Sequence, residues 1–363
     1  MHKAIAIIVT LLFIAPVAAC TLPPLQKKDE KVAAALADPQ TSFFEASRKG
    51  NVVLVMRLVE EKQIDVNQTD AYAWTGLMYA VQNGHSGLAE YFLLRKSQIN
   101  RQDADGLTPL MIAANERQPD IVELLLAFGA DPLMQDQHGF TALMWAIYNK
   151  SWDCIEPLLA TGKGIDLQNG FGETALHLAL DYRCSDIAAM LIQRHAKVNL
   201  ADGRGRTPLH LAAKKGDRDS ILLLLDEGAD TEARDEAGEN PLMKSIRNGR
   251  ASTAMLLLDQ TGNLQTTNQE GQTALHLAAA GDLPDVAAAL IRRKADPNHP
   301  DRQGYTPLMR AVESGAERTI VLLAERGADL KAKNKEGETA LDLARGKRLG
   351  NVIGYLERKM GKP

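Results

Sequence analysis

The stretch Thr207-Pro208-Leu209-His210-Leu211-Ala212-Ala213 recurs along the 363-residue chain at a fixed interval. The residues that align with Thr207 stand 33 residues apart, and each is followed two residues later by leucine. They are Thr75, Thr108, Thr141, Thr174, Thr207, Asn240, Thr273, Thr306 and Thr339. A fixed period of this length indicates a stack of small similar units rather than one globular core.

Each repeat is expected to form two short helices. Threonine and asparagine accept a hydrogen bond from the first helical turn, so the aligned residue is termed the cap, and each repeat is named after its cap. Apolar runs such as 121–126 supply the buried stripe of a second helix, and the glycine of Gly129-Ala130-Asp131 ends it. Glycine also stands two residues before the cap in eight repeats, where a tight turn needs a permissive backbone.

The 33-residue period and the motif Thr-Pro-Leu-His-x-Ala-Ala resemble the ankyrin repeat. The resemblance implies an all-α solenoid of about ten helix-turn-helix units with short β-hairpin turns, placed at residues 41–363. An atypical repeat that begins near Thr41 caps the N-terminal end, and a last repeat with a polar outer face caps the C-terminal end. The composition agrees, because 45% hydrophobic but only 5% aromatic residues fit Leu/Ala-rich helix stacks.

The first 40 residues are expected to lie outside the solenoid. Residues 1–19 combine a positive start with an apolar run too short to span a bilayer, which predicts a signal peptide. Val17-Ala18-Ala19-Cys20 resembles the bacterial lipobox, which implies cleavage before Cys20 and lipidation of its sulfur; the alternative is an ordinary secretory signal. The same pattern with Thr21 favours the outer membrane. Residues 20–40 are expected to be a tether with one short helix at 31–37.

The chain shows no pattern typical of an enzyme, a metal site or a cofactor site. The resemblance makes His177, His210 and His276 framework residues, and methionine takes the same slot in other repeats. Asp103-Ala104-Asp105-Gly106 lacks the distal ligands of a calcium loop and is interpreted as a hairpin turn. A net charge of −4 gives no reason to expect nucleic-acid binding.

Two cysteines, Cys154 and Cys184, remain beyond the lipobox. Secretion would make a disulfide between them chemically possible, and the alternative is two buried thiols. The sequence does not decide between these states.

The resemblance places a binding groove on the hairpin tips and the exposed side of the first helices. The predicted partner-binding residues are the aromatic, histidine and basic residues that occupy those positions. They are Tyr72, Trp74, His138, Phe140, Tyr148, Phe171, Tyr182, Arg204, Arg206, Lys214, Lys215 and Arg247. Aromatic residues and arginine are enriched in protein interfaces. Trp145 and Trp152 fall nearer to framework positions and are not included.

These features predict a monomeric, non-catalytic, lipid-anchored periplasmic protein that binds a protein partner of the bacterial envelope. Ankyrin-repeat lipoproteins of this build include immunity proteins that occlude a secreted toxic enzyme such as a phospholipase, and this is the function expected by resemblance. The alternative is a scaffold that holds an envelope enzyme or assembly factor near the membrane.

Overall fold

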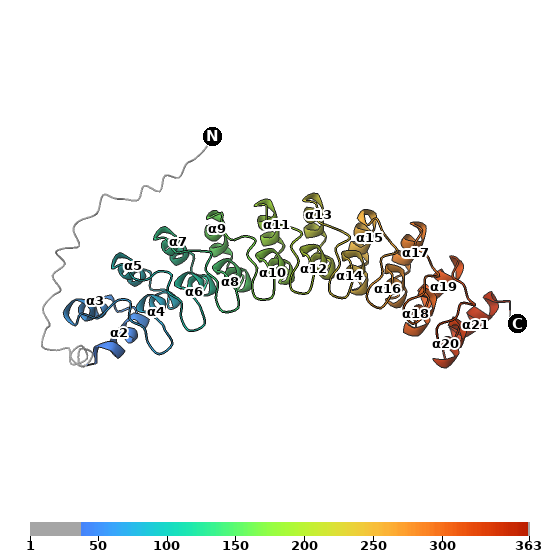
Figure 1. Ribbon diagram of the computed structural model, residues 1–363, viewed down its shortest axis with the longest axis horizontal. Helices are drawn as coiled ribbons and strands as arrows, with labels where there is room; N and C mark the ends of the chain where they lie inside the picture. The colour runs from blue at the N-terminus through green and yellow to red at the C-terminus, as the bar shows by residue number, and fades with distance from the viewer. Residues whose placement is uncertain (1–37, 362–363) are drawn as a thin grey trace, which may run out of the picture. The chain divides into compact units, whose positions relative to one another are not determined.

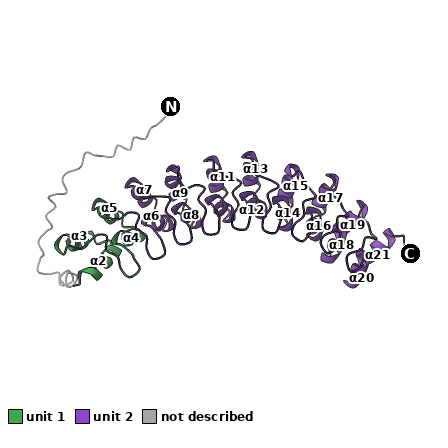
Figure 2. Ribbon diagram, in the orientation of Figure 1, with its two compact units in different colours: residues 1–98 green, residues 99–363 purple. Residues whose placement is uncertain are grey.

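The computed structural model describes residues 38–361, which hold twenty α-helices paired into ten repeats (Figure 1). The chain divides into two compact units, residues 1–98 and 99–363 (Figure 2). The signal peptide, Cys20, most of the tether and the helix expected at 31–37 lie outside the described residues.

Unit 1 contains the first two repeats. Their helices are α2 (Pro39–Arg48), α3 (Val52–Glu61), α4 (Gly76–Gln82) and α5 (Ser86–Leu94). Helix α2 begins before the expected start at Thr41, because Asp38 caps it and Pro39 takes the first helical position, where proline loses no hydrogen bond.

Unit 2 contains the remaining eight repeats, each with a first and a second helix. The first helices are α6 (Pro109–Asn115), α8 (Ala142–Tyr148), α10 (Ala175–Asp181), α12 (Pro208–Lys215), α14 (Pro241–Arg247), α16 (Ala274–Ala280), α18 (Pro307–Ser314) and α20 (Ala340–Gly346). The second helices are α7 (Pro119–Ala127), α9 (Trp152–Ala160), α11 (Ser185–Gln193), α13 (Arg218–Asp226), α15 (Ala251–Gln260), α17 (Pro284–Arg292), α19 (Glu317–Glu325) and α21 (Gly350–Lys359). First helices pack on first helices and second on second, so unit 2 has two parallel rows of helices (Figure 2).

The repeated motif forms the start of each first helix as expected. In the Thr141 repeat, the cap hydroxyl accepts a hydrogen bond from Met144 N at 3.3 Å. In the Thr207 repeat, the buried ring of His210 joins two repeats. Its Nδ1 accepts from Thr207 N at 3.1 Å, and its Nε2–H donates to the Glu239 carbonyl of the next repeat at 3.0 Å. The framework role expected for the three histidines is therefore confirmed, since His177 and His276 make the same contacts.

The hairpin that precedes each cap is closed by backbone hydrogen bonds rather than by a strand pair. Among the described residues, the one β-bridge joins Thr69 and Thr75. From the Thr141 repeat to the Thr339 repeat, each tip donates one backbone N–H to the tip before it, as Gly170 N does to His138 O at 2.7 Å. Gly139 has φ +77°, and an added Cβ would lie 2.6 Å from Gly170 N, so the turn glycine permits this close approach.

The core consists of Leu, Ala, Ile, Val and Met from both helices of each repeat. Cys154 and Cys184 are both buried free thiols, which answers the question that the sequence left open. Burial raises the pKa of the Cys154 thiol to about 11. None of the described helices is both long and apolar enough to span a bilayer.

Candidate functional site

The hairpin tips and first helices of unit 2 form a surface that we term the hairpin face. It carries ten of the twelve predicted binding residues, and Tyr72 and Trp74 belong to unit 1. On the hairpin face most of the predicted residues gather into two neighbouring groups, one aromatic and one charged, whereas Arg247 lies in α14 outside both.

The aromatic group is a chain of four rings across the Thr141 and Thr174 repeats, termed the aromatic row. It consists of Phe140, Trp145, Tyr148 and Tyr182. The ring centroids of Phe140 and Trp145 lie 5.4 Å apart, those of Trp145 and Tyr148 5.7 Å, and those of Tyr148 and Tyr182 5.4 Å. The last pair is perpendicular, the edge-to-face arrangement that aromatic pairs prefer. Tyr148 remains 47% exposed, and burial is the main reason why the pKa of Tyr182 is raised.

Trp145 belongs to this row, although sequence reasoning left it out as a framework residue. Its indole Nε1–H donates to Asp136 Oδ2 at 2.9 Å, which fixes the ring between Phe140 and Tyr148. Trp152, also left out, is 46% exposed on the second helix α9 and is not in the row. Trp145 could have been identified from a pair of aromatic residues five positions apart, one directly before the cap and one four residues after it.

The same spacing pairs Trp74 with Tyr79 in unit 1, where the ring centroids lie 5.1 Å apart. Tyr79 donates its hydroxyl hydrogen to Asp70 at 2.6 Å. Burial and this hydrogen bond to Asp70 raise the pKa of Tyr79 to about 12. Trp74 is half-buried, so it stabilises its own repeat, whereas Tyr72 is 71% exposed at the hairpin tip.

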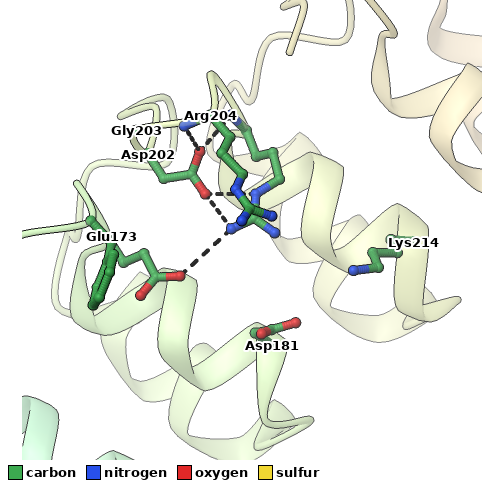
Figure 3. A pocket seen from close by; sticks show the side chains of 8 residues that line it. Glu173, Asp181, Asp202, Gly203, Arg204 and Lys214 are labelled. Atoms are coloured by element: carbon green, nitrogen blue, oxygen red, sulfur yellow. Dashed lines mark hydrogen bonds and ion pairs between the residues drawn. The ribbon is translucent and has the colours of Figure 1, made fainter. Parts of the chain in front are cut away.

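The charged group surrounds a hollow between the hairpins of the Thr174 and Thr207 repeats, termed the charged hollow (Figure 3). It has a volume of about 600 Å³. Its lining residues are Phe171, Glu173, Asp181, Asp202, Gly203, Arg204, Arg206 and Lys214. Gly203 N donates to the Phe171 carbonyl at 2.8 Å, so the two walls are joined at their tips.

The predicted basic residues differ in what they contact. Arg206 pairs with Asp202 at 2.6 Å and lies 3.6 Å from Glu173, and Lys215 pairs with Asp181 at 2.8 Å. Burial would raise the pKa of Asp202, but hydrogen bonds from Arg206 outweigh it and lower that pKa.

Arg247 likewise donates to the buried carboxylate of Glu239 in its own repeat. Three of the predicted cations therefore have partners within the fold. By contrast, the side chains of Arg204, Lys214 and His138 make no hydrogen bond or ion pair within residues 38–361, although Arg204 and Lys214 line the hollow together with charged residues. His138 is exposed beside the aromatic row.

Other chemistry expected from the sequence can also be placed. Asp103 accepts from Asp105 N at 2.9 Å and Leu107 N at 2.8 Å, which confirms that this segment is a hairpin turn. Within residues 38–361, no group of three potential ligands has the geometry to hold a metal ion.

Comparison with known families agrees with this architecture. The family described as "Ankyrin repeats (3 copies)" matches residues 18–103, 77–169, 149–235 and 230–301. The family described as "Ankyrin repeats (many copies)" matches residues 290–344. No curated protein matches the chain. Because the family matches cover most of the sequence and the described helices follow the same period, the chain belongs to the ankyrin-repeat family.

Proposed function

We propose that this chain is a non-catalytic binding protein whose hairpin face in unit 2 holds a protein partner. Ankyrin repeats are modules for protein–protein interaction. The observation that carries the proposal is the aromatic row, in which Tyr148 is 47% exposed at the centre of a chain of packed rings. Rings fixed in this way lose little conformational entropy when a partner covers them, which favours their use as anchors.

The chain supplies a matched control for this proposal. Tyr148 and Trp152 lie in the same repeat with nearly equal exposure, 47% and 46%, but on the first and second helix respectively. Tyr148→Ala should weaken partner binding about 30-fold, since truncated interface anchors cost about 2 kcal/mol. Trp152→Ala should bind as the parent protein does.

The two positions can be compared before the partner is known. A photo-crosslinking residue at position 148 should capture a protein that the same residue at position 152 does not. Loss of binding in Trp152→Ala but not in Tyr148→Ala would move the site to the second-helix row.

The finer proposal is that the mature chain begins at a lipidated Cys20 and lies in the periplasm, anchored to the outer membrane. The support is the sequence of residues 1–21. Cys20→Ser should release the chain from membranes or block its processing. If Cys20→Ser still fractionates with outer membranes, the lipid anchor is wrong.

Within that setting, we propose that the partner is a secreted toxic enzyme such as a phospholipase, which the chain occludes as an immunity protein. The support is the combination of a lipobox and an ankyrin solenoid. Deleting the gene should harm cells only when the toxic enzyme is produced. Harm in the absence of any such enzyme would favour the alternative, an envelope scaffold.

A further inference from the structure

We propose that the charged hollow binds an acidic side chain of the protein partner, held by Arg204 and Lys214, next to an apolar side chain that covers Phe171. This inference rests on the proposed function and names the chemistry of the segment that the hairpin face recognises. Three observations carry it: the pairing of charges in the hollow, the placement of the two cations, and the continuity with the aromatic row.

The first observation is that the acidic side chains of the hollow already have charged partners, whereas two of its basic side chains do not. Asp202 accepts from Arg206 and from the backbone N–H of Arg204, at 2.6 and 2.9 Å. Asp181 pairs with Lys215, and Glu173 lies within ion-pair distance of Arg206. Arg204 and Lys214 line the same hollow with no charged partner in the described part of the chain. A carboxylate of the partner would therefore supply the negative charge that Arg204 and Lys214 lack.

The second observation is where the two cations lie. Arg204 stands on the hairpin tip that joins the Phe171 carbonyl through Gly203, and Lys214 stands near the end of helix α12 (Figure 3). Lys214 is half-buried, which strengthens a charge interaction relative to a fully solvated one. Opposite Lys214, Asp181 ends helix α10 and is already paired with Lys215.

The third observation is that the hollow continues the aromatic row. Tyr182, the last ring of the row, directly follows Asp181, and Phe171 lines the hollow with 63% of its surface exposed. An exposed phenylalanine beside two free cations fits a segment in which an acidic and an apolar residue are close in sequence.

The lining favours a singly charged carboxylate over a phosphate. Glu173 and Asp181 face the same hollow, and their carboxylates would repel a dianion more strongly than a monoanion. The hollow of about 600 Å³ also admits more than a small ion, which suits an amino-acid side chain with its neighbours.

The test is selection from a library of random 12-residue peptides displayed with a free N-terminus and a fused C-terminus, so that only side chains supply carboxylates. The full chain should enrich peptides in which Asp or Glu neighbours an apolar residue. The Arg204→Glu/Lys214→Glu variant should lose this enrichment, and selected peptides should bind it at least about tenfold more weakly. The matched control is Lys335→Glu, an exposed cation on the last hairpin, which should leave the enrichment unchanged.

The outcomes separate this inference from the proposed function. Peptides that depend on Tyr148 but show no preference for acidic residues would overturn the inference and leave the protein-binding face in place. Peptides that are displaced by inorganic phosphate, but not by chloride at equal ionic strength, would show that the hollow is a phosphate site and also overturn it. Binding unaffected by both Tyr148→Ala and the double charge reversal would overturn the proposed function as well.

Discussion

Backbone conformation at the hairpin turn separates the Thr75 repeat from the others. Eight hairpins place glycine two residues before the cap, but this repeat places Ala73 there, with φ +62°. A side chain in this left-handed region costs roughly 1 kcal/mol, because Cβ crowds the following carbonyl. Among the hairpins of residues 38–361, this is therefore the one with a side chain at the strained turn position.

We expect Ala73→Gly to stabilise unit 1 by up to about 1 kcal/mol, because relief of strain exceeds the added entropy of the unfolded chain. Denaturant unfolding measures the change. Gly139→Ala provides the opposite case, since its Cβ would meet Gly170 N at 2.6 Å, and it should lower stability. Destabilisation by Ala73→Gly would mean that the positive φ is not a source of strain.

In most hairpins the side chains at three positions are matched to one another: the residue five before the cap, the residue directly before the cap and the residue four after it. The aspartate five residues before the cap accepts from the fourth residue after the cap, as Asp136 does from Trp145 and Asp301 from Arg310. Where that fourth residue is leucine, the earlier position is asparagine in three of four repeats, as with Asn268 and Leu277. In these repeats the residue five before the cap is therefore either an aspartate with a side-chain donor or a neutral asparagine. Two repeats differ: Asp202 accepts from Arg206, and Asp103, in the repeat with Ile112, accepts from backbone N–H groups alone.

Lys244 tests this set, because it pairs with two buried carboxylates, Asp235 at 2.6 Å and Glu239 at 2.8 Å. Lys244→Leu should cost about 3 kcal/mol, since it leaves the buried carboxylate of Asp235 without its cation, whereas Glu239 keeps Arg247. Adding Asp235→Asn and Glu239→Gln recreates the residues of the Thr273 repeat and should recover all but about 1 kcal/mol. Failure of the triple variant to recover stability would show that the three positions are not interchangeable between repeats.

Beyond single hairpins, the extensive helix contacts within each unit join helices of the same or the adjacent repeat. Stability is therefore expected to be a sum of local terms along the stack. Leu224→Ala, at a fully buried position in α13, should cost about 2–5 kcal/mol and weaken hydrogen-exchange protection in the centre of unit 2. Leu356→Ala in α21 should open mainly the C-terminal repeat. Uniform loss of protection in both variants would contradict local coupling.

The buried histidines make stability depend on pH. Burial lowers the pKa of His177 and His210, and lowers that of His276 from 6.5 to about 4. As the pH falls, these histidines are protonated in the unfolded chain before they are protonated in the folded chain. The folded state therefore keeps its full stability above about pH 6.5 and loses part of it as the pH falls toward 4. The shift at His276 corresponds to about 3 kcal/mol.

His276→Met provides the measurement, because methionine occupies this slot in other repeats, for example Met243 and Met309. Thermal unfolding between pH 7 and 4 should depend less on pH in this variant than in the parent chain. An unchanged pH dependence would show that His276 is not one of the groups responsible.

Much of the fold was predictable because the repeat encodes it locally. The caps, the turn glycines and the framework histidines each have a short-range physical role, and the structure confirms them at Thr141, Gly139 and His210. The early start of α2 was missed because Asp38 and Pro39 stand outside the regular register.

The candidate surface was less predictable, because exposure at a repeat position does not say what the side chain contacts. Arg206, Lys215 and Arg247 were expected to face a partner, and they pair with acids from the same or the preceding repeat. Trp145 was missed because its role depends on Asp136, nine residues away, and on Tyr148 in the next helical turn.

The tip-to-tip hydrogen bonds of unit 2 also bear on how such a protein diversifies. The backbone hydrogen bonds between tips do not involve the side chain of the residue three places before each cap, so this residue can be replaced without breaking them. In chain order from the Thr108 repeat these residues are Asp105, His138, Phe171, Arg204, Ala237, Glu270, Gln303 and Glu336. Each repeat thus contributes one variable residue to the row of tips, and a substitution there changes one position of the row. Duplicating or deleting a 33-residue segment would lengthen or shorten the row by one residue. Substitutions at the tips could therefore restore binding to a partner whose surface has changed, while the helices beneath stay unchanged.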